Sequence, residues 1–266
     1  MRKIGGLFFC CILLIALAGC SFGNNMTKKE TVKKETEMET KKTTEKVEKA
    51  KEKKKLIAID AGHQQEQNSE LEPIGPGAET KKMKVASGTQ GIESGTPEYK
   101  VNLAVSKKLQ QRLQEEGYQV LMIRETNDVN LSNRERAQIA NEAKADIFIR
   151  IHCNSAEDPT VQGALTLCPD ADNPFCEEQM IKESSRLSEL VLEDLCQNTG
   201  AKKLSIIRSS DMSGINWCEV PVTIVEMGFM SNPQEDEKLN EEGYQMQLTE
   251  GMVNGIKAYF NEREEE

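Results

Sequence analysis

Two stretches of this 266-residue chain are apolar at nearly every position, and they constrain the fold more than any other feature. One covers residues 147–152 and the other covers residues 221–225. A strand that is apolar on both faces is typical of the centre of a parallel sheet with helices on both sides. The two stretches therefore favour a layered α/β architecture.

Other apolar segments alternate along the chain with segments of helical periodicity. The alternation predicts a single domain with a twisted, mostly parallel sheet of about six strands and helices on both faces. We expect strands at residues 56–60, 119–124, 147–152, 162–168, 204–207 and 221–226. We expect helices at residues 97–116, 132–144, 178–198 and 235–260.

The first 20 residues have the pattern of a targeting segment. Arg2 and Lys3 precede an apolar stretch, residues 7–18, that is short for a transmembrane helix. The stretch ends in Leu-Ala-Gly-Cys, which resembles the bacterial lipobox, so we expect a signal peptide over residues 1–20 and a lipid anchor on Cys20. An uncleaved anchor or a simple secretory signal is the alternative. We expect an exported protein that is lipid-anchored to the membrane surface.

Residues 21–55 contain twelve Lys, seven Glu and six Thr, and almost nothing apolar. Such a segment cannot bury enough surface to fold, so we expect a charged, disordered tether. Residues 56–266 remain as the expected folded domain. Subtracting the five net positive charges of residues 21–55 and the two of residues 1–20 from the total of −10 leaves −17 on this domain. So acidic a domain is a poor candidate for binding nucleic acid.

The expected domain contains five cysteines, and none of them has the spacing of a cysteine zinc site. An odd number leaves at least one thiol free or paired between chains. Cys168 and Cys176 flank a turn, where they could close a short disulfide. The sequence leaves the pairing undecided among Cys153, Cys168, Cys176, Cys196 and Cys218.

The chain has only two histidines, and each stands where an apolar strand runs into a turn. His63 follows the first expected strand, His152 ends the third, and the last apolar run ends in Glu226. Because parallel strands end at one edge of their sheet, we expect these three side chains to meet there. Taken singly, each has a simpler interpretation: a capped turn histidine, a core histidine, and a buried acid paired with a basic side chain.

Glu98 stands at the start of the helix expected at 97–116. Val101, Val105 and Leu109 follow it at helical spacing, so Glu98 points along the buried face. A buried carboxylate is costly unless it is paired or bound to metal, although an acid in a first turn also stabilises the helix dipole. With the two histidines, Glu98 completes a ligand set typical of a catalytic zinc that keeps one open position.

Four ordered motifs carry a resemblance to a known family. They are Asp-Ala-Gly-His ending at His63, Glu98 at a helix start, Ile-His-Cys-Asn at 151–154, and the segment from Val225 to Asn232. Arg124, Arg136 and Ala140-Asn141 add to the pattern. The chain from 56 to 262 resembles the zinc-dependent N-acetylmuramoyl-L-alanine amidases of the amidase type 3 family.

The resemblance implies that His63, Glu98 and His152 hold Zn²⁺ and that Glu226 is the general base and acid that activates the zinc-bound water. The reaction would be hydrolysis of the amide bond between the lactyl group of N-acetylmuramic acid and the L-alanine of the peptidoglycan stem. The alternative is a non-catalytic exported lipoprotein that binds zinc or muropeptide. A carboxylate that is not a ligand, Glu226, favours the enzyme.

Several other residues are candidates for shaping the substrate groove. Asn154 is placed to orient a ligand or a substrate carbonyl, and Trp217 either stacks on the substrate or packs within the protein. The long segment from 64 to 95 is expected to form part of the rim. Arg150 stands where the family often has a small residue, and it could reshape the groove or pair with Glu226. We expect a monomer that faces the cell wall and binds peptidoglycan or muropeptide.

Overall fold

The computed structural model of the protein describes residues 54–265. The expected signal peptide, the lipid anchor on Cys20 and the tether up to residue 53 lie outside this range. In the described part, no helix combines the length and apolarity needed to cross a membrane.

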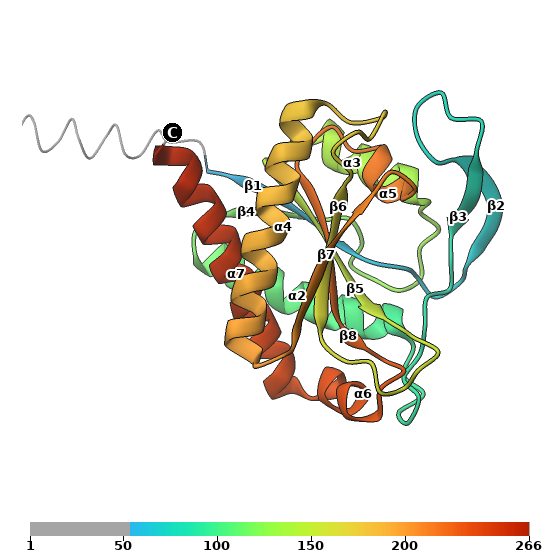
Figure 1. Cartoon of the computed structure of the whole chain (residues 1–266), viewed down its shortest axis with the longest axis vertical. Helices are drawn as coiled ribbons and strands as arrows, with labels where there is room; N and C mark the ends of the chain where they lie inside the picture. Colours follow the sequence, from blue (N-terminus) through green and yellow to red (C-terminus); the bar gives the residue numbers. More distant parts are fainter. Residues whose placement is uncertain (1–53, 266) are drawn as a thin grey trace, which may run out of the picture. The chain divides into compact units, whose positions relative to one another are not determined.

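Six strands form the main sheet, in the order β4-β1-β5-β8-β6-β7 (Figure 1). Strands β4, β1, β5 and β8 are parallel, whereas β6 runs antiparallel to β8 and β7 pairs in parallel with β6. This confirms the mostly parallel sheet, and each expected strand is present with its ends shifted by a few residues. The strands are β1 (Leu56–Ala61), β4 (Gln119–Met122), β5 (Ile147–Asn154), β6 (Ala164–Pro169), β7 (Lys203–Ser209) and β8 (Val222–Phe229).

Helices cover both faces of this sheet. Successive residues of a strand face opposite sides, and the buried residues of β1 and β5 follow this rule. Ile57 and Ile149 pack with α2, α4 and α7 on one face, while Ala58 and Phe148 pack with α3 and α5 on the other. The helices are α2 (Glu98–Glu115), α3 (Asn133–Glu142), α4 (Glu178–Thr199), α5 (Ser213–Asn216) and α7 (Glu242–Glu265).

The prediction of a single helix at 235–260 is wrong, because two helices occupy this region. The first, α6 (Pro233–Asn240), is followed by Glu241, which has an extended backbone, and α7 begins at the next residue. The side-chain amides of Asn240 and Gln245 donate to main-chain carbonyls of α6. These bonds satisfy carbonyls at the end of α6 that would otherwise need a continuing helix.

The long segment after His63 is more regular than its sequence suggested. It contains an antiparallel pair of strands, β2 (Asn68–Pro73) and β3 (Lys81–Val85), which form their own small sheet. Both strands are rich in charged residues, so they lack the apolar run that marks a buried strand. Leu71 and Met83 face each other across the pair and are both exposed.

All five cysteines of the described range are free thiols. The short disulfide considered between Cys168 and Cys176 is absent. Cys168 instead lies at the end of β6, where its sulfur accepts a weak hydrogen bond from Arg208 at 3.7 Å.

Candidate metal centre and active site

The carboxyl-terminal edge of the sheet brings together the four residues expected there. Strand β1 runs into the turn that carries His63, and His152 of β5 lies in register with Glu226 of β8. Glu98 is the first residue of α2, whose start lies at the same edge. The parallel arrangement of β1, β5 and β8 therefore gathers side chains that are far apart in the sequence.

Glu98 is only 2% exposed, and its carboxylate contacts both imidazole rings, which meet edge to face with centroids 4.8 Å apart. Its Oε2 atom is 3.3 Å from Nε2 of His63, and its Oε1 atom is 3.2 Å from Nδ1 of His152. One ligand atom from each of the three residues lies within 4.8 Å of the other two. These residues therefore form a compact group of three donors.

The carboxylate of Glu98 is also held by neutral donors. It accepts the main-chain N–H of Thr89 at 2.9 Å and that of Cys153 at 3.0 Å, and the side-chain amide of Asn102 at 3.0 Å. Burial alone would raise the pKa of Glu98, but its contacts with the two histidines hold that pKa well below the usual value. Glu98 is therefore a fixed, ionised carboxylate.

Both imidazoles are suited to bind a cation. Nδ1 of His63 lies 2.8 Å from the carbonyl oxygen of Ala86, which can only accept, so Nδ1 carries a proton and Nε2, on the side of Glu98, is the ring nitrogen left for a metal. Burial lowers the pKa of His152 to about 4, so this ring is neutral at pH 7. Nε2 of His152 is buried and has no hydrogen-bond partner within residues 54–265. The donor set therefore fits a zinc ion.

Cys153 lies close to this group but is not suited to be a ligand. Burial raises the pKa of its thiol well above the usual value, and the carboxylate of Glu98 raises it further. Because the thiolate is the form that binds metal, Cys153 remains a buried thiol.

Glu226 lies beside His152 on the neighbouring strand and makes no ion pair within residues 54–265. Its Oε2 atom is buried without a hydrogen-bond partner in that range. Burial and the nearby charge of Glu98 raise the pKa of Glu226 to about 8, and Arg150 opposes this shift. Arg150 pairs with Asp60 and not with Glu226. Glu226 thus combines an uncommitted oxygen with an environment that favours carrying a proton.

A cleft of about 520 Å³ opens over His63, His152 and Glu226. Lys82 and Met83 of β3, with Ala86 just beyond, form part of its lining, which confirms that the segment from 64 to 95 contributes to the rim. Asp211, Met212 and Gly214, before and within α5, line it as well. The cleft is therefore bounded by elements that the sequence did not predict as regular structure.

The comparisons with known proteins agree with this geometry. The family model described as N-acetylmuramoyl-L-alanine amidase matches residues 57–258. The chain belongs to this family. The amidase is therefore an enzyme that hydrolyses amide bonds of peptidoglycan.

Individual relatives are distant. The amidase is 28% identical over 196 residues to the uncharacterized protein YqiI of Bacillus subtilis, across 72% of this chain and 88% of YqiI. It is 25% identical over 169 residues to the N-acetylmuramoyl-L-alanine amidase LytC of the same species, across 64% of this chain but only 32% of LytC. Its fold matches the amidase Ami1 of Mycobacterium smegmatis with a TM-score of 0.71, at 20% identity, across 78% of this chain and 97% of Ami1.

Two buried arginines hold the turn that presents His63 in the amidase. His63 has a φ of 58°, a left-handed conformation that is uncommon for a residue with a side chain. Arg136 donates to the carbonyl of His63 at 3.0 Å, and Arg124 donates to the carbonyls of Ala61 at 2.7 Å and Gly62 at 3.1 Å. These bonds stabilise a strained turn, as is common at functional sites.

Two glycines of the amidase pack directly against the donor group. A Cβ on Gly62 would lie 2.2 Å from the ring of His152. Gly88 has a φ of +78°, and a Cβ there would lie 2.6 Å from Oε2 of Glu98 and 2.9 Å from the ring of His63. Only glycine allows this close approach of the main chain to the three donors.

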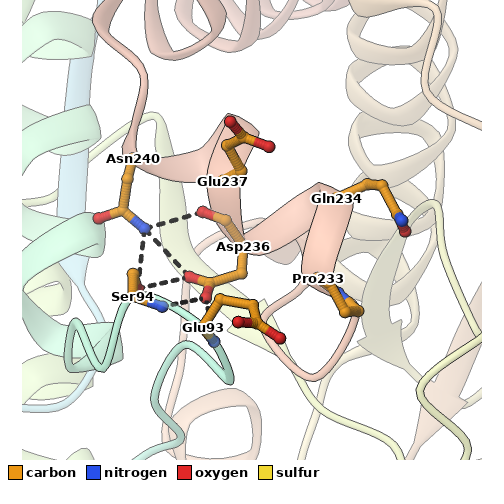
Figure 2. A pocket seen from close by; sticks show the side chains of 7 residues that line it. All are labelled: Glu93, Ser94, Pro233, Gln234, Asp236, Glu237 and Asn240. Atoms are coloured by element: carbon orange, nitrogen blue, oxygen red, sulfur yellow. Dashed lines mark hydrogen bonds between the residues drawn. The ribbon is translucent and has the colours of Figure 1, made fainter.

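A buried aspartate of α6 fastens the loop between Gly88 and Glu98. Figure 2 shows Asp236 with Ser94 and Asn240 around it. The carboxylate accepts the main-chain N–H groups of Glu93 at 2.9 Å and Ser94 at 2.8 Å, and the Ser94 hydroxyl at 2.6 Å. Sequence reasoning missed this residue, because its partners lie more than 140 positions earlier in the chain.

The two expected substrate contacts lie outside the lining of the cleft. Asn154 ends β5, and its side-chain oxygen accepts the N–H of Ser155. Trp217 donates from its ring nitrogen to the carbonyl of Pro73, and the guanidinium of Arg134 lies over its ring at 4.2 Å. Trp217 thus joins the β2–β3 pair to α5, and its contact with substrate stays a prediction, as does that of Asn154.

Proposed function

We propose that this amidase uses zinc to hydrolyse the amide bond between the lactyl group of N-acetylmuramic acid and the L-alanine of the stem peptide. One observation carries the proposal: the ligand atoms of His63, Glu98 and His152 converge beside the buried, unpartnered Oε2 of Glu226. Family membership supports the choice of bond, because the description of the family, N-acetylmuramoyl-L-alanine amidase, names the two groups that the bond joins.

His63, Glu98 and His152 would hold the zinc ion, which leaves one coordination position for the reaction. When bound, zinc supplies a Lewis acid that lowers the pKa of water and polarises the scissile carbonyl. The remaining chemistry belongs to the side chains of the protein.

Glu226 is the residue placed to move protons. In its ionised form, Glu226 accepts at its free Oε2 atom a proton from the attacking water as the new carbon–oxygen bond forms. The same carboxyl group then gives this proton to the nitrogen of L-alanine as the carbon–nitrogen bond breaks. The leaving group departs as a neutral amine, and Glu226 returns to its starting state.

We infer further that a lipid on Cys20 holds the enzyme at the membrane surface. The support is the Leu-Ala-Gly-Cys sequence after a short apolar stretch. The charged segment that follows would let the catalytic domain reach the wall. We also infer that the domain acts as a monomer.

The test is to digest purified peptidoglycan with the full chain and to identify the products by mass spectrometry. We expect stem peptides with a free L-alanine amino group, loss of activity with a chelator, and recovery with zinc. Glu226→Gln should keep zinc and lose roughly 10²- to 10⁴-fold in rate. His152→Ala should lose zinc and activity together. Products cut at another amide bond would refute the proposed specificity, and an active Glu226→Gln variant would refute the role of Glu226.

A further inference from the structure

Arg150 is a cationic side chain in the cleft that the proposed chemistry does not use. It precedes His152 by two residues on β5, so both side chains point to the same face of the sheet and their Cα atoms are roughly 7 Å apart. Its side chain is only 4% exposed, yet it lines the cleft. Arg150 thus lies one step along the strand from the reacting groups.

One nitrogen of the Arg150 guanidinium is uncommitted. Nε donates to Asp60 at 3.0 Å, and Nη2 donates to the side-chain oxygen of Asn133 at 2.8 Å. Nη1 has no hydrogen-bond partner within residues 54–265. It is not one of the buried unpartnered atoms of that range, so part of its surface is accessible. It fills the space over Gly214, where a Cβ would lie 1.5 Å from it. Nη1 therefore offers its hydrogens to the cleft.

The charge of Arg150 is only partly compensated. Its counter-ion Asp60 also pairs with Arg136 at 2.7 Å, and both of those side chains are fully buried. Arg124 lies beside them and donates only to carbonyl and amide oxygens. Three guanidinium groups thus have one carboxylate, that of Asp60, among their hydrogen-bond partners. A buried cation whose charge is incompletely paired favours an anionic partner.

The other cation of the cleft is less suited to this role. Lys82 is more than 40% exposed in its side chain, and its ammonium group already contacts the carboxylate and the carbonyl of Asp211. Arg150 is the rigid, buried cation with a free donor.

Resting on the proposed function, we propose that Arg150 determines specificity by binding a free carboxylate of the stem peptide. The scissile amide lies beside His152 and Glu226, so Arg150 reaches a group about two residues along an extended peptide. The acidic residue that follows L-alanine carries its carboxylate at this separation. A carboxamide there would accept a hydrogen bond without the charge, so the enzyme selects the acidic form.

The test compares two synthetic muropeptides that differ in one group. Both carry N-acetylmuramic acid and L-alanine, and the second stem residue is either D-isoglutamate or D-isoglutamine. We expect kcat/KM of the wild-type enzyme to be roughly 10- to 100-fold higher for the carboxylate form. In Arg150→Gln this ratio should fall close to one, because the carboxylate substrate loses more than the carboxamide substrate.

A second variant keeps the inference testable if Arg150→Gln does not fold. Asn133→Asp retains the oxygen that accepts from Arg150 and adds a negative charge beside it, and an acid in the first turn of α3 favours that helix. Asn133→Asp should also bring the ratio of kcat/KM for the carboxylate and carboxamide substrates closer to one. Arg186→Gln is the matched control, because Arg186 lies on the exposed face of α4 in a surface pair with Glu262. It should leave the ratio at the wild-type value.

Equal kcat/KM values for the two substrates in the wild-type enzyme would overturn the role of Arg150 and leave the proposed reaction intact. An unchanged ratio in a folded Arg150→Gln variant would overturn it as well. If the wild-type enzyme cleaves neither muropeptide but does bind zinc, the proposed reaction itself is wrong, and this inference fails with it.

Discussion

Replacing Gly88 with alanine tests whether the main chain of the loop before α2 shapes the metal centre. Two separate costs follow from the structure. The left-handed backbone at φ +78° costs a residue with a side chain about 1–2 kcal/mol. The new Cβ would also lie 2.6 Å from Oε2 of Glu98, so this distance must open to the 3.4 Å of an ordinary contact, a shift of about 0.8 Å.

The second cost falls on the metal ligand. Oε2 of Glu98 accepts the N–H of Thr89 at 2.9 Å, and a shift of about 0.8 Å away from Gly88 disrupts that bond and the fixed position of the carboxylate. Loss of such supporting contacts typically lowers metal affinity roughly 10- to 100-fold. We therefore expect Gly88→Ala to lose stability and zinc affinity together.

Gly77→Ala provides the matched control. Gly77 has a φ of +75°, and a Cβ there would meet nothing within 4 Å, so this variant has only the backbone cost. Zinc affinity is measured by competition with a chelator, and the free energy of unfolding by urea denaturation. Both variants should lose about 1–2 kcal/mol of stability, but only Gly88→Ala should bind zinc more weakly. Equal zinc affinities in the two variants would refute the argument that Gly88 protects the ligand group.

Two further predictions concern stability and location. Burial alone would raise the pKa of Asp60, but Arg136 and Arg150 hold this pKa well below its usual value. The stability that Asp60 contributes is therefore present above its unfolded pKa of about 3.9 and is lost as the pH falls below that value. Asp60→Asn should lower the free energy of unfolding, measured by urea denaturation, by about 3–5 kcal/mol at pH 7 and by clearly less at pH 3. A stability difference between wild type and variant that does not change with pH would contradict this. Cys20→Ser should move the protein from the detergent phase to the aqueous phase in phase partitioning, whereas retention in the detergent phase would show another anchor.

The strands and the convergence of the three donor side chains with Glu226 could be predicted because their signals are local. The apolar runs of β1, β5 and β8 mark buried strands, and the order of parallel strands places their ends at one edge. His63, His152 and Glu226 follow those runs directly. Glu98 could be added because helical spacing places it on the buried face of α2.

The walls of the cleft could not be predicted in this way. Strands β2 and β3 consist mostly of charged and polar residues, and their pairing is set by tertiary contacts such as that of Trp217 with Pro73. The direction of β6 has no signal in its own sequence. Arg150 did carry a signal: a single charge in an apolar run needs a buried counter-ion, and Asp60 is the single charge in the run of the adjacent strand.

The residues of the metal centre sit in parts of the molecule that open at different rates. His152 and Glu226 lie on β5 and β8, which are hydrogen-bonded on both sides and whose amide protons should exchange only on global unfolding. His63 and Glu98 depend on the segment from 86 to 97, which is attached by a few contacts at Ala86, Thr89 and Asp236. Local opening of that segment, detectable as faster amide exchange, would remove one supporting bond from each of these two side chains, while Arg136 and Cys153 still hold them. We therefore expect zinc, bound as proposed, to exchange through opening of this loop of about a dozen residues and not through unfolding of the sheet.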